Sequence, residues 1–251
     1  SYERGMQVAL SAMLVSPHFL FRVEPGGDGD VQGGELRLSD AQLACRLSYF
    51  LWSSMPDAEL FALADANKLN FPEELDRQVR RMLLDPKAQS LAENFAGQWL
   101  NLRNLDDIKP DPQQFKSFSD ELRSDMKRET FTFFNAVVAE DRSLLDFLNA
   151  DFSFVNERLA RHYGIDGGRG DEFRRISLQS VNRAGILTQA SILTLTSNPT
   201  RTSPVKRGKW IMEVLLGSPP PPPPADVPEL EDTDGDGLVP RWVHDVLCTH
   251  A

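Results

Sequence analysis

The sequence is poor in the residues that bind cofactors and form cross-links. Its 251 residues include only two cysteines, Cys45 and Cys248, and four histidines. Two cysteines so far apart form neither a Cys-x-x-Cys-His haem attachment motif nor a network of disulfides. The sequence also lacks a Gly-x-Ser-x-Gly elbow, a phosphate-binding loop, a dinucleotide fingerprint and a His-Glu-x-x-His zinc motif. We therefore expect no haem in this segment, and no standard motif assigns a reaction.

Long apolar runs and an excess of positive charge are missing as well. No stretch of about 18 consecutive apolar residues occurs, so we expect no membrane-spanning helix. Lysine and arginine number 27 against 37 acidic residues, which gives a net charge of −10. General nucleic-acid binding needs a broad basic surface, so this balance argues against a nucleic-acid partner.

The positive charge that is present is concentrated in one part of the chain. Residues 173–212 hold seven basic residues and no acidic one. Within this window, Ser203 followed by Pro204 predicts the N-cap and first position of a helix. Lys206 and Arg207 then fall in the first turn, where the helix dipole disfavours cations. Backbone N–H groups and hydroxyls at a helix start suit an anion.

We therefore interpret residues 197–210, called the basic loop below, as a candidate anion-binding site. Its expected ligand is an anionic small molecule, an acidic saccharide or an acidic protein surface. The same cations can instead form a solvated face or pair with acids elsewhere in the chain. The candidate anion-binding residues are Arg201, Thr202, Ser203, Lys206, Arg207 and Lys209.

Apolar periodicity predicts an all-α fold. We expect a compact multi-helix domain of about seven or eight helices, followed by an irregular proline-rich C-terminal tail. Ser39 to Gln42 reads as a capping box, and Ser119 as the cap of the longest helix, over about residues 119–139. Residues 183–195 have helical spacing but many β-branched side chains, which leaves a strand open there.

Composition divides the chain into four parts. Glycines around residues 26–34 and the prolines of 219–224 predict linkers. We assign the parts as the end of a preceding module with a Gly-rich linker, a helical core module, a second module with the basic loop, and a proline-rich acidic linker with a truncated tail. Their bounds are residues 1–35, 36–165, 166–218 and 219–251.

Two further groups of residues suggest chemistry. Asp232, Asp234 and Asp236 alternate as in the start of a calcium loop, but Val243 stands where the twelfth-position Glu is expected. A flexible acidic linker is the other interpretation, so a divalent metal is a candidate cofactor without being assigned. His162 ends a short predicted helix and is a candidate catalytic base, or a histidine that complements the helix dipole.

Longer segments resemble a known family. Residues 38–40 with 46–57, and 151–160 with 162–164, resemble one module of large secreted planctomycete-type proteins. Residues 185–189 through Trp210 are similar to the next module. In that family these domains of unknown function follow one another, with cytochrome c-type haem segments elsewhere in the polypeptide.

The resemblance implies an excised central piece of an exported protein, periplasmic or extracellular, whose partners include neighbouring modules of the parent. It supplies no activity. We carry two hypotheses forward. One is a helical ligand- or partner-binding module that holds an anionic group at the basic loop. The alternative is a hydrolase of phosphate, sulfate, carboxyl or glycosidic esters, with or without a metal. There Arg201, Lys206 and Arg207 would stabilise developing charge, with His162 or a carboxylate as base.

Overall fold

The computed structural model describes residues 2–21, 38–166 and 168–221. This part of the chain is mostly helical and contains one small two-stranded sheet. The three candidate calcium ligands, Asp232, Asp234 and Asp236, lie outside the described residues.

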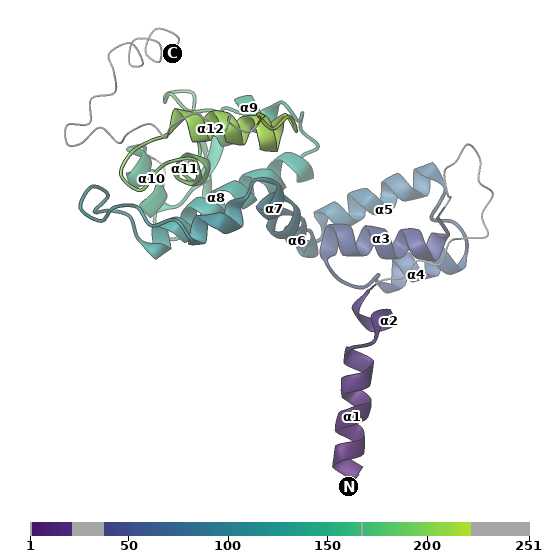
Figure 1. The fold of residues 1–251 in the computed structure, drawn as a ribbon. Helices are drawn as coiled ribbons and strands as arrows, with labels where there is room; N and C mark the ends of the chain where they lie inside the picture. The colour runs from purple at the N-terminus through teal and green to yellow at the C-terminus, as the bar shows by residue number, and fades with distance from the viewer. Residues whose placement is uncertain (1, 22–37, 167, 222–251) are drawn as a thin grey trace.

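The first half of the described chain forms a projecting helix and a three-helix group (Figure 1). The projecting helix α1 has no buried residue. In the three-helix group, α3 contacts both α4 and α5. These helices are α1 (Tyr2–Leu14), α2 (Pro17–Leu20), α3 (Asp40–Trp52), α4 (Ala58–Asp65) and α5 (Pro72–Leu84).

A segment of short helical turns then leads into the second group of helices, which is built around the 20-residue α8 (Figure 1). The short turns are η1 (Pro86–Ala88), α6 (Gln89–Leu91), the π-helical η2 (Ala92–Ala96), α7 (Gly97–Trp99) and η3 (Leu102–Asp106). The second group contains α8 (Asp120–Ala139), α9 (Asp146–Asn149), α10 (Glu157–Tyr163), η4 (Ile186–Thr188), α11 (Ala190–Leu195), α12 (Pro204–Trp210) and η5 (Ile211–Leu215).

The prediction of an all-α fold is partly correct, because the described residues are mostly helical but include a two-stranded sheet. Strand β1 (Phe152–Val155) pairs antiparallel with β2 (Arg174–Ser177), and Phe152 lies opposite Ser177. Four-residue strands are too short for a period-of-two pattern to stand out, and α10 separates them in sequence. Residues 183–195, where a strand was left open, are helical in η4 and α11.

Several helix starts follow from local chemistry. The Ser39 hydroxyl accepts a hydrogen bond from the Gln42 N–H at 3.2 Å, and the Gln42 side chain accepts from the Ser39 N–H at 2.9 Å. This confirms the capping box. Ser119 and Ser203 cap α8 and α12 in the same way, each through one bond to the third residue of its helix.

Helix α8 takes part in both buried apolar clusters. Phe133, Phe134 and Val137 belong to the larger cluster, which extends from α3 to α12. Leu122 and Met126 belong to the smaller one, with residues of β1, α10 and α11. Between these two runs, Glu129 and Thr130 of α8 are buried as well, and both are polar.

Candidate functional site

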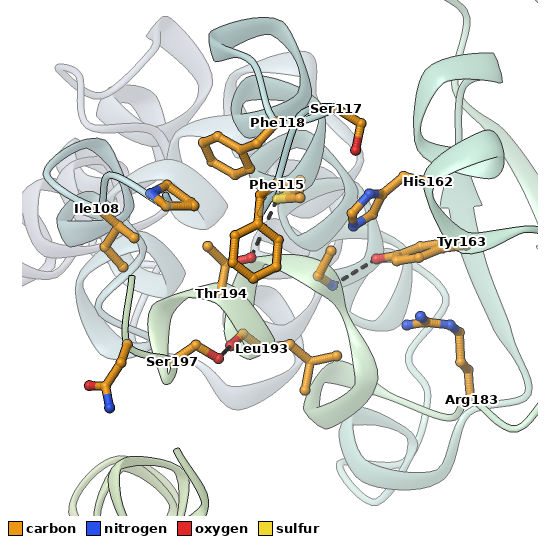
Figure 2. A pocket seen from close by; sticks show the side chains of 14 residues that line it. Ile108, Phe115, Ser117, Phe118, His162, Tyr163, Arg183, Leu193, Thr194 and Ser197 are labelled. Atoms are coloured by element: carbon orange, nitrogen blue, oxygen red, sulfur yellow. Dashed lines mark hydrogen bonds between the residues drawn. The ribbon is translucent and has the colours of Figure 1, made fainter. Parts of the chain in front are cut away.

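A pocket of about 190 Å³ lies where α8, α10 and α11 meet the 108–118 segment and the start of the basic loop. We call it the Tyr163 pocket (Figure 2). One part of its lining is apolar and comes from Ile108, Pro110, Phe115, Phe118, Met126, Ala190 and Leu193. The rest is polar and comes from Ser117, His162, Tyr163, Arg183, Thr194, Ser197 and Asn198. Among the described residues, this lining contains one cation, Arg183, and no carboxylate.

Arg183 supplies that cation and is held in a defined position. Its guanidinium carbon lies 4.0 Å from the centre of the Tyr163 ring, and Nη1 donates to the Thr188 carbonyl at 2.6 Å. The Thr188 hydroxyl in turn accepts from the Ala184 N–H at 2.9 Å, so both residues 183 and 184 are bonded to Thr188. No carboxylate forms an ion pair with Arg183 among the described residues. Its charge is therefore available to a bound anion.

The conformation of this loop depends on a glycine. Gly185 has φ 53°, and its N–H donates to the Ala150 carbonyl at 3.0 Å. A Cβ at this position would lie 2.5 Å from the backbone carbonyl of Leu148. Only glycine both adopts this φ without strain and leaves the backbones in contact. This contact places the Arg183 loop against the end of α9.

Tyr163 joins the pocket to the interior. Figure 2 shows His162 and Arg183 on either side of it. The hydroxyl accepts from the Ala190 N–H at 2.7 Å and donates to Glu129 Oε2 at 2.5 Å. Burial, together with the neighbouring Glu129 charge, raises the pKa of Tyr163 well above its ordinary value. Tyr163 is therefore protonated at neutral pH and has one hydrogen to donate.

Glu129 is the buried acid behind Tyr163. It is 1% exposed, lies in the middle of α8, and accepts hydrogen bonds from Tyr163 and from the Ser153 hydroxyl at 2.6 Å. Burial raises its pKa to about 7, against the opposing effects of those two hydrogen bonds and the positive charge of Arg183. No lysine or arginine of the described residues lies within ion-pair distance of it. Glu129 therefore changes its charge near neutral pH.

His162, the predicted catalytic base, lines the pocket next to Tyr163, with 5.8 Å between the two ring centres. Partial burial, with a smaller contribution from the charge of Arg183, lowers its pKa. At neutral pH the imidazole is therefore mostly uncharged. Within the described ranges its ring nitrogens form no hydrogen bond to a hydroxyl or carboxylate.

The basic loop contributes to the pocket through its first residues and not through its cations. Ser197 and Asn198 line the pocket. Arg207 instead donates to the hydroxyl of Thr196 at 3.4 Å and to that of Thr202 at 3.2 Å, and Lys209 pairs with Glu213 at 3.6 Å.

The remaining loop candidates lie at the surface. Arg201 and Lys206 are exposed, and Ser203 uses its hydroxyl to cap α12 by accepting from the Lys206 N–H at 3.3 Å. The structure thus does not gather the six candidate residues around one point. Their role as anion ligands stays a prediction.

Two models of protein families match the chain, one over the segment that contains Tyr163 and one over the segment that contains Arg183. A family model described as "Protein of unknown function (DUF1592)", PSD4, matches residues 38–165, just over half of the chain. The chain belongs to this family. A second model, PSCyt3, described as "Protein of unknown function (DUF1588)", matches residues 183–245. Both are named for planctomycete cytochrome c-associated proteins, which confirms the resemblance seen in the sequence. Searches of curated proteins and of solved structures found no match.

The Tyr163 pocket lies between the two matched segments. Its residues from Ile108 to Tyr163 fall in the PSD4 match, and those from Arg183 to Asn198 fall in the PSCyt3 match. The stacking of Arg183 on Tyr163 therefore joins the two. The division of the chain into four parts stays a prediction.

Two of the central residues were not singled out from the sequence. Glu129 stands three residues after Met126 and four before Phe133, on the apolar stripe of α8. An acid at such a position is a signal for a buried, functional or paired carboxylate. Tyr163 gave no comparable signal, because the partners of its hydroxyl come from distant parts of the chain.

Residues 2–21, 38–166 and 168–221 hold no group of three or more His, Cys, Asp or Glu side chains able to bind a metal ion. None of the described helices has both the length and the apolar character needed to cross a bilayer.

Proposed function

We propose that this chain is a ligand-binding module that holds a small anion with an apolar part in the Tyr163 pocket. The observation that carries this proposal is the Arg183 guanidinium in a pocket that, in the part of the chain the structure describes, is lined by no carboxylate. The chemical class is a carboxylate, phosphate or sulfate attached to an aromatic or aliphatic group.

The two parts of the pocket suit such a ligand. Stacking on Tyr163 fixes the plane of the guanidinium, and a fixed guanidinium binds the oxygens of an oxyanion with two parallel hydrogen bonds. The apolar part of the ligand would contact Phe115, Phe118 and Ile108. Mostly apolar walls with a few placed polar groups are typical of small-molecule sites.

The larger setting of the module is also a proposal. The names of both families point to cytochrome c-associated proteins, so we place the module in a larger exported, redox-linked polypeptide. Its neighbouring modules are then its first partners. The exposed cations of the basic loop, Arg201, Lys206 and Lys209, would contact an acidic saccharide or an acidic protein surface.

Hydrolysis of phosphate, sulfate, carboxyl or glycosidic esters is the second candidate. It is favoured by one observation, a largely uncharged His162 in the same pocket as Arg183. In this version Arg183, and not Arg201 or Lys206, is the cation near the base and stabilises developing negative charge. Chromogenic esters of these classes, assayed with and without chelator, test it. Turnover that is equal in a His162→Ala variant would rule it out.

Calorimetric titration with benzoate tests the binding function. We expect heat of binding from the native chain and about a tenfold or greater loss of affinity in Arg183→Met, since a charge-assisted hydrogen bond contributes about 1.5–3 kcal/mol. The matched control is the double variant Arg201→Ala, Lys206→Ala, which removes two loop cations and should leave benzoate affinity unchanged. A loss confined to the double variant would assign the anion to the loop instead. No heat from the native chain would contradict the proposal.

A further inference from the structure

The buried acid behind Tyr163 points to a property of the pocket beyond anion binding. Glu129 is connected to the pocket by one hydrogen bond, from the Tyr163 hydroxyl to Oε2 at 2.5 Å. It has no ion-pair partner among the described residues. A buried carboxylate without a paired cation is costly in its charged form, so the protein gains when Glu129 becomes neutral.

We propose that Glu129 takes up one proton when an anion enters the Tyr163 pocket, and that Tyr163 relays this proton. The inference rests on the proposed binding function and names its regulation. The ligand is then bound as an anion plus a proton.

The hydrogen-bond pattern gives the route. With Glu129 ionised, the hydroxyl hydrogen of Tyr163 is directed to Glu129, and its oxygen accepts from the Ala190 N–H at 2.7 Å. In that state Tyr163 offers the pocket no hydrogen. With Glu129 protonated, the new Glu129 O–H donates to the Tyr163 oxygen, and the Tyr163 hydrogen is free to donate to a bound anion. Protonation therefore converts the pocket from a poor anion site to a better one.

The proton transfer balances without another reactant. A ligand that enters as a neutral carboxylic acid gives its proton to the Tyr163 oxygen while the Tyr163 hydrogen moves to Glu129 Oε2. An O–H bond of the ligand and that of Tyr163 break, and new O–H bonds form on Tyr163 and Glu129. The result is a carboxylate beside Arg183, an unchanged Tyr163 and a neutral Glu129. Entry of the anion with a proton from solvent gives the same products.

Electrostatics act in the same direction. The groups that face Glu129 are Tyr163 from α10, the uncharged Ser153 from β1, and the charge of Arg183 from the loop before η4. Arg183 favours the ionised form of Glu129 while its own charge is uncompensated. A bound anion neutralises that effect and adds a negative charge nearby. Both changes raise the affinity of Glu129 for a proton.

The test is calorimetric titration of the whole chain with benzoate, from about pH 5 to about pH 9, in pairs of buffers with different ionisation enthalpies. The dependence of the heat on the buffer gives the number of protons taken up. We expect uptake to approach one proton per benzoate above pH 7, and affinity to fall about tenfold per pH unit there. In Glu129→Gln both effects should disappear above pH 7, where the lowered pKa of His162 leaves that side chain uncharged.

Two further variants keep the outcome clear. Glu121→Gln is the matched control, since Glu121 lies exposed on the same helix and its pKa is lowered, chiefly by a hydrogen bond with Ser119. It should take up protons like the native chain. If Glu129→Gln does not fold, Tyr163→Phe removes the hydroxyl that connects Glu129 to a bound anion, and the uptake per benzoate should fall well below that of the native chain. Binding with no proton uptake, or uptake unchanged in either site variant, would overturn the inference and leave the binding function standing. Absence of benzoate binding at every pH would overturn both.

Discussion

Arg183 stacks on Tyr163 with 4.0 Å between its guanidinium carbon and the ring centre. This contact joins a segment of the PSD4 match to a segment of the PSCyt3 match. It also places one cation close to two titratable groups, His162 and Glu129, with opposite consequences. Arg183 disfavours the charged form of His162 and favours the charged form of Glu129. The charge of Arg183 therefore influences the protonation of both His162 and Glu129.

The first prediction follows from that coupling. In Arg183→Met the pKa of His162 should rise toward its ordinary value, because one of the two causes that lower it is removed. Proton NMR of the imidazole ring as a function of pH measures this. Arg174→Met, which removes an exposed cation of β2, is the control and should leave the His162 titration unchanged. An unshifted His162 in Arg183→Met would show that burial alone sets its pKa.

The second prediction concerns stability and pH. The pKa of Glu129 is about 7 in the folded protein and near its ordinary value of 4.5 in the unfolded chain. Between these values the folded state holds a proton that the unfolded state has lost, so stability falls as pH rises from 4.5 to 7 and then levels off. The total effect is on the order of 3 kcal/mol.

Denaturant unfolding of Glu129→Gln and of the native chain, compared at several pH values, measures this contribution. Glu129→Gln should lack this pH-dependent contribution. Its free energy of unfolding relative to that of the native chain should therefore increase as pH rises from 4.5 to 7. His162 gives the opposite slope, because a lowered pKa makes stability fall as pH drops below the ordinary value of 6.5. A difference between the two chains that does not vary with pH would contradict the assignment to Glu129.

Part of this architecture could be predicted from the sequence. Helix starts are set by local chemistry, and the caps at Ser39, Ser119 and Ser203 were correctly predicted from a few neighbouring residues. The sheet was missed because β1 pairs with β2, a strand some twenty residues away in the chain. Local periodicity does not contain that information.

The candidate site shows the same limit. The basic loop was visible as a concentration of charge, and His162 as a residue of tunable charge. The pocket, however, is made by five separate segments, and its cation is Arg183 and not Arg201 or Lys206. Which cation faces a pocket depends on packing between elements far apart in sequence. Glu129 was the one site residue whose position on an apolar stripe could have identified it.

The third prediction concerns the polar pair beside Glu129. The hydroxyls of Thr130 and Ser191 lie 2.7 Å apart, and both residues are fully buried between α8 and α11. Thr130→Val keeps the shape of the side chain but leaves the Ser191 hydroxyl without a partner, which should cost about 1–3 kcal/mol. Adding Ser191→Ala should recover part of this loss, because the unpaired hydroxyl is then gone. Chemical denaturation of both single variants and the double variant measures the coupling, and strictly additive losses would contradict it.

The fourth prediction compares two glycines. At Gly185, φ is 53° and an added Cβ would lie 2.5 Å from the backbone of Leu148, so Gly185→Ala must displace the Arg183 loop. We expect a loss of about 2 kcal/mol or more, with weaker benzoate binding. Gly208 lies within α12 and has open space around it, so Gly208→Ala should stabilise the protein by about 0.5–1 kcal/mol. The chemical change is the same at both positions. Changes in melting temperature of opposite sign would therefore show that the backbone conformation at Gly185 requires glycine. A Gly185→Ala variant as stable as the native chain would show that the loop adopts another conformation.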